Sequence, residues 1–153
     1  MNKIIKALQK VETKFIFAER QNTKISAANV GWHIEHIILA NNRIIDATKA
    51  SNPADYKWKF DKNRFFAFLL KKFPRGRAKA PKASLPVSEF NEAEVKLKLE
   101  LAKQKILELD NLSATHYLDH PFFGKTKLSG VKKVLLIHTN HHLKIIADII
   151  KQS

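Results

Sequence analysis

Cysteine is absent from this chain of 153 residues, and its absence limits the possible chemistry before any motif is considered. A chain without thiols forms no disulfide, no thiolate metal site and no cysteine nucleophile, so any bound metal must be held by imidazole nitrogen or by oxygen. Glycine and proline are also scarce, with 4 and 5 residues, while 44% of the residues are hydrophobic. This composition argues against a disordered chain and favours helices.

Long apolar runs are missing as well. The longest apolar block spans residues 65–70, far short of the ~20 residues with which a helix crosses a bilayer. Lysines at positions 3, 6, 10 and 14 interrupt the apolar residues near the N-terminus, which is not the pattern of a signal peptide. We therefore expect a cytoplasmic protein without a membrane partner.

Acidic residues are half as numerous as basic ones, 14 against 28, and the formal net charge is +14. Such an excess favours polyanionic partners, because clustered lysine and arginine gain affinity by releasing counterions from phosphates. The densest cluster, residues 71–82, carries six positive charges and no acid, and its proline and glycine predict a loop. No recognised nucleic-acid motif accompanies the cluster. We therefore favour a solvated or substrate-steering loop over the alternative, a nucleic-acid-binding helical module with structural histidines.

The length suits a single domain, which we expect to span residues 1–153. Apolar residues at helical spacing predict four helices. They cover residues 2–17, a stretch from a cap at Ser26 or Asn29 to about residue 50, a stretch from a cap at Ser88 to residue 109, and the region after a cap at Ser129. Residues 53–86 are irregular and predict a long crossover connection between the second and third helices. The expected fold is an all-α four-helix bundle, and a homodimer through an apolar face is compatible with it.

Aromatic residues divide between two predicted roles. Those in the crossover connection, at positions 65, 66 and 68, are expected to pack over one end of the bundle, and Trp32 and Trp58 to belong to the core. Residues 120–124, with the sequence His-Pro-Phe-Phe-Gly, predict a packed turn before the last helix.

Two pairs of histidines are the best indication of function. His138 and His142 lie four residues apart on the apolar side of the last predicted helix, so they point the same way, one turn apart. His33 and His36 lie on the second predicted helix and offer a third ligand from a facing helix. Buried imidazoles need partners, which either protein groups or a metal ion can supply. The coincidence of two pairs favours a three-histidine metal site, and the choice between His33 and His36 stays open.

The motif Asn29-Val30-Gly31-Trp32 followed by His36, together with His138-x-x-x-His142, resembles the DinB-like (YfiT-like) superfamily of metal-dependent four-helix bundles. The resemblance extends over about residues 26–150 and points to a little-characterised branch. Further segments that carry it are residues 32–36, 56–60, 73–77, 120–124 and 138–146. It implies that His36, His138 and His142 are the metal ligands, with His33 and His141 beside them.

Three neutral ligands leave a divalent ion its charge and at least one open position, as in catalytic sites. Zinc is the first expectation and nickel the second, because imidazole suits both. Superfamily members with known activities are similar to thiol transferases or hydrolases, so the resemblance implies a transferase or hydrolase with a small-molecule substrate such as a low-molecular-weight thiol. No catalytic residue is assigned: Glu35 and Asp148 are expected to point away from the pocket, whereas His33, His120 and His141 are candidates for proton transfer.

Overall fold

The structure, a computed structural model, describes residues 3–73, 85–86 and 89–152. Over these residues the chain is mostly helical, with one small antiparallel sheet. The helices are α1 (Lys3–Glu12), α2 (Val30–Lys49), α3 (Lys62–Leu70), α4 (Glu92–Glu108) and α5 (Leu128–Gln152), and the strands are β1 (Tyr117–His120) and β2 (Gly124–Lys127). Short 3₁₀ turns follow α1, α2 and α4, at Phe15–Phe17, Pro53–Asp55 and Leu109–Asn111. No helix in the described part of the chain has the length and apolar character needed to cross a membrane.

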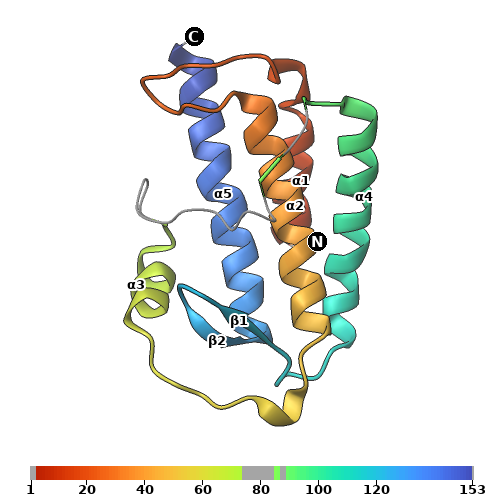
Figure 1. Ribbon diagram of the computed structural model, residues 1–153, viewed down its shortest axis with the longest axis vertical. Coiled ribbons are helices and arrows are strands. Elements are labelled where there is room, and N and C mark those ends of the chain that lie inside the picture. The colour runs from red at the N-terminus through yellow and green to blue at the C-terminus, as the bar shows by residue number, and fades with distance from the viewer. Residues whose placement is uncertain (1–2, 74–84, 87–88, 153) are drawn as a thin grey trace.

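Four of the helices pack side by side around a shared apolar core (Figure 1). α1 and α2 each contact both α4 and α5. All four helices contribute fully buried side chains, among them Leu8, Val11, Ile34, Ile38, Leu99, Ile106, Leu135 and Ile146. Burying one such side chain contributes roughly 1.5–3 kcal/mol. This core therefore holds α2 and α5, which carry the two histidine pairs, at a fixed spacing.

α3 lies outside this group of helices and packs through a second, smaller core. Ala67 of α3, Phe123 of the β1–β2 hairpin and Val134 of α5 form it. Arg64 adds two hydrogen bonds, in which its Nη1 donates to the carbonyl oxygens of Phe123 at 2.9 Å and Lys125 at 2.7 Å. These contacts attach α3 to the hairpin and to Val134 of α5.

The β1–β2 hairpin corrects the expectation of an all-α chain. Its strands pair from Tyr117↔Lys127 to His120↔Gly124, and the turn predicted at residues 120–124 connects them. Gly124 adopts a φ of +59°, a conformation that glycine reaches without strain. Strands of four residues are too short for a clear alternating pattern, which is why the sequence did not predict them. The mostly helical character is confirmed, whereas an all-α four-helix bundle is not.

Side-chain caps explain where the helices begin. Asn29, not Ser26, caps α2, since its side-chain oxygen accepts from the N–H of Trp32 at 2.8 Å. Asn91 caps α4 by accepting from the N–H of Glu94 at 3.1 Å, and the expected cap at position 88 lies outside the described residues. The expected cap at position 129 is wrong, because α5 begins at Leu128 directly after β2.

The crossover connection contains α3, whose aromatic residues are more exposed than predicted. Phe65 and Phe66 are 49% and 56% exposed, and Trp58 is 69% exposed. The residues of α3 that pack against the rest of the protein are Ala67 and the half-buried Phe68. The prediction that Trp58 belongs to the core, and that Phe65 and Phe66 cover one end of the bundle, is therefore wrong.

Gly31 lies where the start of α2 passes close to Phe90. A Cβ atom on residue 31 would come within 2.9 Å of the Phe90 Cβ. We expect Gly31→Ala to lower the free energy of unfolding by about 1–3 kcal/mol, because overpacking forces the backbone to shift. Urea unfolding measures the loss, and Gln104→Ala on the exposed side of α4 serves as a control that changes stability by less than ~0.5 kcal/mol. An unchanged midpoint for Gly31→Ala would contradict the close approach.

Candidate metal centre

Helices α2 and α5 bring the two predicted histidine pairs face to face. α2 begins at Val30, which places His33 and His36 in its first two turns, and both side chains are buried. On α5, His142 is buried and His138 is half-buried. The two helices are in direct contact, so the pairs meet between them.

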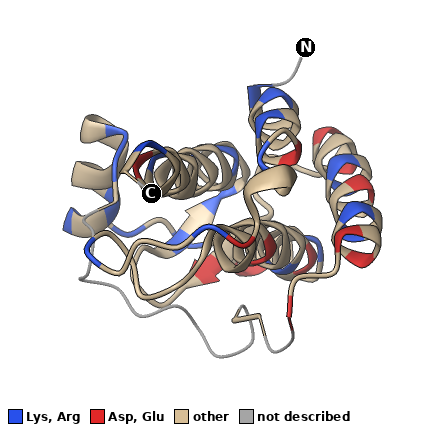
Figure 2. Ribbon diagram, turned by 90° about the horizontal axis from the view of Figure 1, so that it is seen from above, with Lys and Arg blue, Asp and Glu red and all other residues tan. Residues whose placement is uncertain are grey.

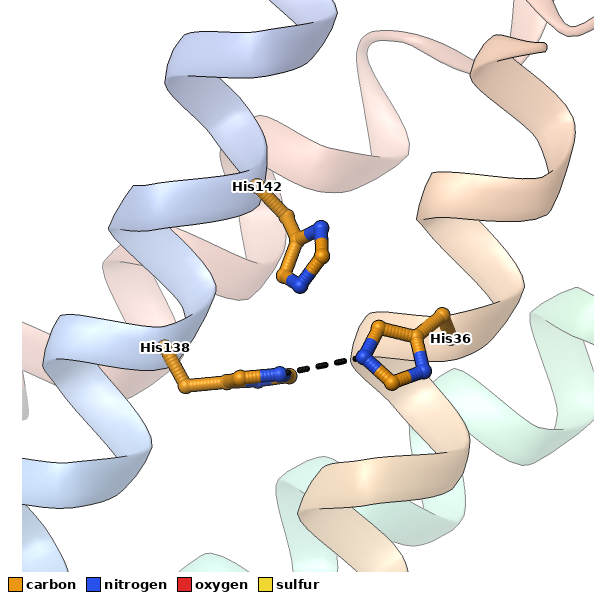
Figure 3. A group of neighbouring side chains, drawn as sticks. All are labelled: His36, His138 and His142. Atoms are coloured by element: carbon orange, nitrogen blue, oxygen red, sulfur yellow. Dashed lines mark hydrogen bonds between the residues drawn. The ribbon is translucent and has the colours of Figure 1, made fainter. Parts of the chain in front are cut away.

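His36, His138 and His142 form a compact group. Each ring offers one nitrogen, and these three atoms all lie within 4.8 Å of one another. Nε2 of His36 and Nε2 of His138 are 3.2 Å apart and hydrogen-bonded, as the dashed line in Figure 3 shows. Two nitrogens bound to one zinc ion at ~2.0–2.1 Å and at the tetrahedral angle lie about 3.3 Å apart. The observed separation therefore suits a shared ion with little movement of either helix.

His142 turns one ring nitrogen toward the same space. Its Nδ1 lies 3.0 Å from Nδ1 of His33. Nε2 is therefore the nitrogen that points to the gap between His36 and His138 in Figure 3. Nε2 of His33 lies 2.9 Å from Oγ of Ser26. Hydrogen bonds thus connect Ser26 to His33 and His33 to His142, which is a member of the three-nitrogen group.

These hydrogen bonds determine where the protons lie when a metal occupies the group. A metal on Nε2 of His142 takes that lone pair, so Nδ1 keeps its hydrogen and donates it to Nδ1 of His33. Since that atom of His33 accepts, its Nε2 carries the hydrogen and donates to Oγ of Ser26. The geometry thus includes His36 in the group and places His33 behind His142, where it can fix the orientation of that ring.

Trp32 packs against His36, on the α2 side of the group. Its indole stacks on the ring of His36, with centroids 5.0 Å apart and an interplanar angle of 15°. The same indole meets the ring of His33 edge-on, at 5.1 Å and 87°. Trp32 is only half-buried, so it forms a wall of the histidine group instead of a central part of the core.

Burial keeps the imidazoles of His138 and His142 neutral. Desolvation is the main reason that the pKa of His138 is lowered to about 3, and repulsion from neighbouring histidines adds to it. Desolvation likewise lowers the pKa of His142, with further contributions from His138 and His36. A neutral imidazole has a free lone pair for a metal ion. Near pH 7, His138 and His142 can therefore bind a cation without first losing a proton.

The second ring nitrogen of His138 lacks a hydrogen-bond partner among the described residues. Nδ1 of His138 is buried and has no hydrogen-bond partner among the residues that the structure describes. Leaving a buried donor or acceptor unpaired costs about 1–3 kcal/mol. The buried ring of His138 therefore gains no stability through Nδ1, and its Nε2 is the nitrogen that faces His36.

Neither carboxylate considered from the sequence belongs to the group. Glu35 is buried but faces α4, where its Oε1 lies 3.7 Å from Nζ of Lys98. Burial raises the pKa of Glu35, and Lys98 opposes this shift. Asp148 is half-buried, more than one turn beyond His142 on α5. The candidate ligands are therefore neutral imidazoles alone.

Two further histidines considered from the sequence, His120 and His141, differ in their contact with the group. Nδ1 of His120 accepts from the N–H of Phe122 at 3.1 Å, and its ring stacks on Phe123 with centroids 4.6 Å apart, so His120 belongs to the hairpin turn. Burial lowers the pKa of His120. His141 packs edge-on against His142, with centroids 5.0 Å apart. Of the three proton-transfer candidates, His33 and His141 therefore contact a member of the group.

A cleft of about 290 Å³ lies beside the group, between the end of α3 and α5. Its lining includes Lys71, Lys72 and Phe73, the first residues of the basic segment predicted at residues 71–82; residues 74–82 of that segment lie outside the described residues. His141 and Lys144 line it from α5. The sequence placed Phe73 and Lys144 only within longer segments, such as 73–77 and 138–146, and gave neither a role at the site. The spacing of three residues between His141 and Lys144 was a usable signal for Lys144.

Comparisons of the chain with protein-family models, with curated proteins and with solved structures find no match.

Proposed function

We propose that this protein binds one divalent metal ion through His36, His138 and His142, and that it is a metal-dependent transferase of the thiol S-transferase type or a hydrolase. The observation that carries the proposal is the convergence of three ring nitrogens from two helices within 4.8 Å. The resemblance of the sequence to the DinB-like superfamily of four-helix bundles supports the same ligands and the same classes of reaction.

The composition of the group favours a reactive site over a closed structural one. Structural zinc sites have four protein ligands, whereas catalytic sites have three and keep a position open. With three neutral ligands, a divalent ion retains its full charge and lowers the pKa of a water or thiol that binds to it. The substrate we propose is a small molecule, such as a low-molecular-weight thiol. Zinc is the metal we propose first and nickel second, since imidazole suits both.

The protein's own part is to hold the three rings in position. The core between α2 and α5 sets the distance between the helices, Trp32 stacks on His36, and His33 orients His142. Residues that orient a ligand in this way typically change metal affinity ~10–100-fold when they are replaced. The geometry therefore predicts a graded order of effects among the histidines.

Metal titration of the purified protein, prepared without a histidine tag, tests the proposal. We expect one zinc or cobalt ion per chain, the largest loss of affinity for His36→Ala, and a loss of ~10–100-fold with unchanged stoichiometry for His33→Leu. His116→Ala, in the loop before β1, is the matched control and should bind as the wild type does. Equal affinity in the wild type and His36→Ala would overturn the proposed site.

A further inference from the structure

We propose that the cleft between the end of α3 and α5 binds an anionic group, a carboxylate or a phosphate, on the small molecule that reacts at the histidine group. The cleft measures about 290 Å³. The claim about the reacting molecule rests on the proposed function. The anion site itself does not, because it can be tested without any metal.

Two side chains connect the cleft to the histidine group. The ring of Phe73 lies 6.3 Å from the ring of His138 and 6.1 Å from that of His141, measured between centroids. His141 packs in turn against His142, at 5.0 Å. A single layer of side chains thus separates the cleft from the three nitrogens. A flexible molecule anchored in the cleft can extend a reactive end past Phe73 to that group.

The charge of the cleft indicates what it binds. Lys71, Lys72 and Lys144 line it together with the amide of Asn140, and none of the described lining residues is acidic. Lysine supplies a positive point charge that suits a carboxylate or phosphate, and an asparagine amide can donate to the same oxygens.

No acid among the described residues neutralises these lysines. None of the three forms an ion pair with the described residues. By contrast, Lys98 and Lys103 on α4 pair with glutamates of the same helix. Figure 2 shows this contrast: α4 carries alternating positive and negative residues, whereas α3 carries positive residues only. The cleft therefore keeps positive charge available for a ligand.

The end of α3 places the side chain of Lys71 at the cleft. Lys71 follows α3 in the left-handed conformation, with a φ of 51°, and no other non-glycine residue in the described part of the chain has a positive φ. Glycine is the usual residue at this position of a helix end, because it carries no Cβ. A lysine there adds backbone strain while it places a positive side chain at the cleft.

Titration of the metal-free protein with hexanoate and with hexanol tests the anion site. The two probes share an alkyl chain and differ in charge, and the amide NMR signals of Phe73, Asn140 and His141 report binding in the cleft. We expect hexanoate to bind roughly tenfold more tightly than hexanol. Each lysine removed should weaken hexanoate about two- to fivefold, as expected for partly exposed ion pairs.

Two variants and one control make the test specific. Lys71→Gly removes one positive charge from the cleft, and glycine suits the left-handed backbone at this position, so the variant should remain folded. Lys144→Gln removes one positive charge from the α5 side of the cleft. Lys96→Gln, on the exposed side of α4, removes an equal charge far from the cleft and should leave binding unchanged. Equal affinity for hexanoate and hexanol, or equal weakening by all three variants, would overturn the inference.

A second titration separates this inference from the proposed function. The cobalt-loaded protein is titrated with mercaptohexanoate and mercaptohexanol, and the thiolate-to-cobalt absorption band reports binding. If the protein prefers mercaptohexanoate and Lys71→Gly and Lys144→Gln reduce this preference, the link between the cleft and the metal is supported. If the two variants leave the preference unchanged, that link is overturned. If cobalt does not bind, the proposed function fails, whereas a preference for hexanoate in the metal-free protein still supports the anion site.

Discussion

Replacing His138 with leucine is expected to change the stability of the metal-free protein little and that of the metal-loaded protein strongly. In the metal-free protein, leucine removes a buried nitrogen that has no hydrogen-bond partner among the described residues. Leucine also breaks the hydrogen bond between Nε2 of His138 and Nε2 of His36. Because these two effects oppose each other, the free energy of unfolding should change by no more than about 1 kcal/mol.

With metal present, the same substitution should be strongly destabilising relative to the wild type. An ion that binds only the folded state adds about 2.7 kcal/mol of stability at a free concentration of 100 times its Kd, and about 4.1 kcal/mol at 1,000 times. His138→Leu loses one of the three candidate ligands and with it this gain. Urea unfolding with a chelator and with excess zinc measures both effects, and His116→Leu is the control. Zinc that stabilises His138→Leu as much as the wild type would contradict the assigned ligands.

Acid should unfold the metal-free protein steeply below about pH 6.5. The pKa of His138 falls from an ordinary value of 6.5 to about 3 in the folded protein, chiefly because the ring is desolvated. Between these two values the unfolded chain binds a proton that the folded protein does not bind. Stability is therefore complete above pH 6.5 and falls as the pH falls toward 3, by about 1.4 kcal/mol per pH unit for one histidine.

His142 increases the effect, because burial lowers its pKa as well. Together the two histidines give a slope of up to about 2.8 kcal/mol per pH unit, which is large beside a total stability of about 5–15 kcal/mol. Urea unfolding at pH 7, 6 and 5 in the presence of a chelator measures the slope. His138→Leu should reduce it to roughly half, and His116→Gln should not change it. A stability that stays constant over this range would show that the rings are not desolvated in the folded state.

The parts of the site that were predictable are those fixed by a single helix. His138 and His142 are four residues apart, so the geometry of a helix alone makes them neighbours. Asn29 was recognised as one of two candidate caps, and the structure selects it by a hydrogen bond to Trp32. Helical periodicity therefore predicted the elements that carry the candidate ligands.

The remaining features depend on how separate elements pack. His33 and His36 both lie on the side of α2 that faces α5, and only the approach of the two helices decides that His36 joins the group while His33 contacts His142 from behind. Phe73 reaches the site from the end of α3, and residues that come together from such distant parts of a chain leave no local pattern. The hairpin was missed for a different reason, since its strands are too short for periodicity to indicate them.

The most direct test of the central claim is anomalous scattering from crystals grown with zinc. We expect one strong peak between α2 and α5, about 2.0–2.1 Å from a ring nitrogen of each of His36, His138 and His142, with the hydrogen bond between His36 and His138 replaced by two bonds to the ion. If crystals at saturating zinc show no peak at this place, and Nε2 of His36 is still hydrogen-bonded to Nε2 of His138, the three-histidine metal site is contradicted.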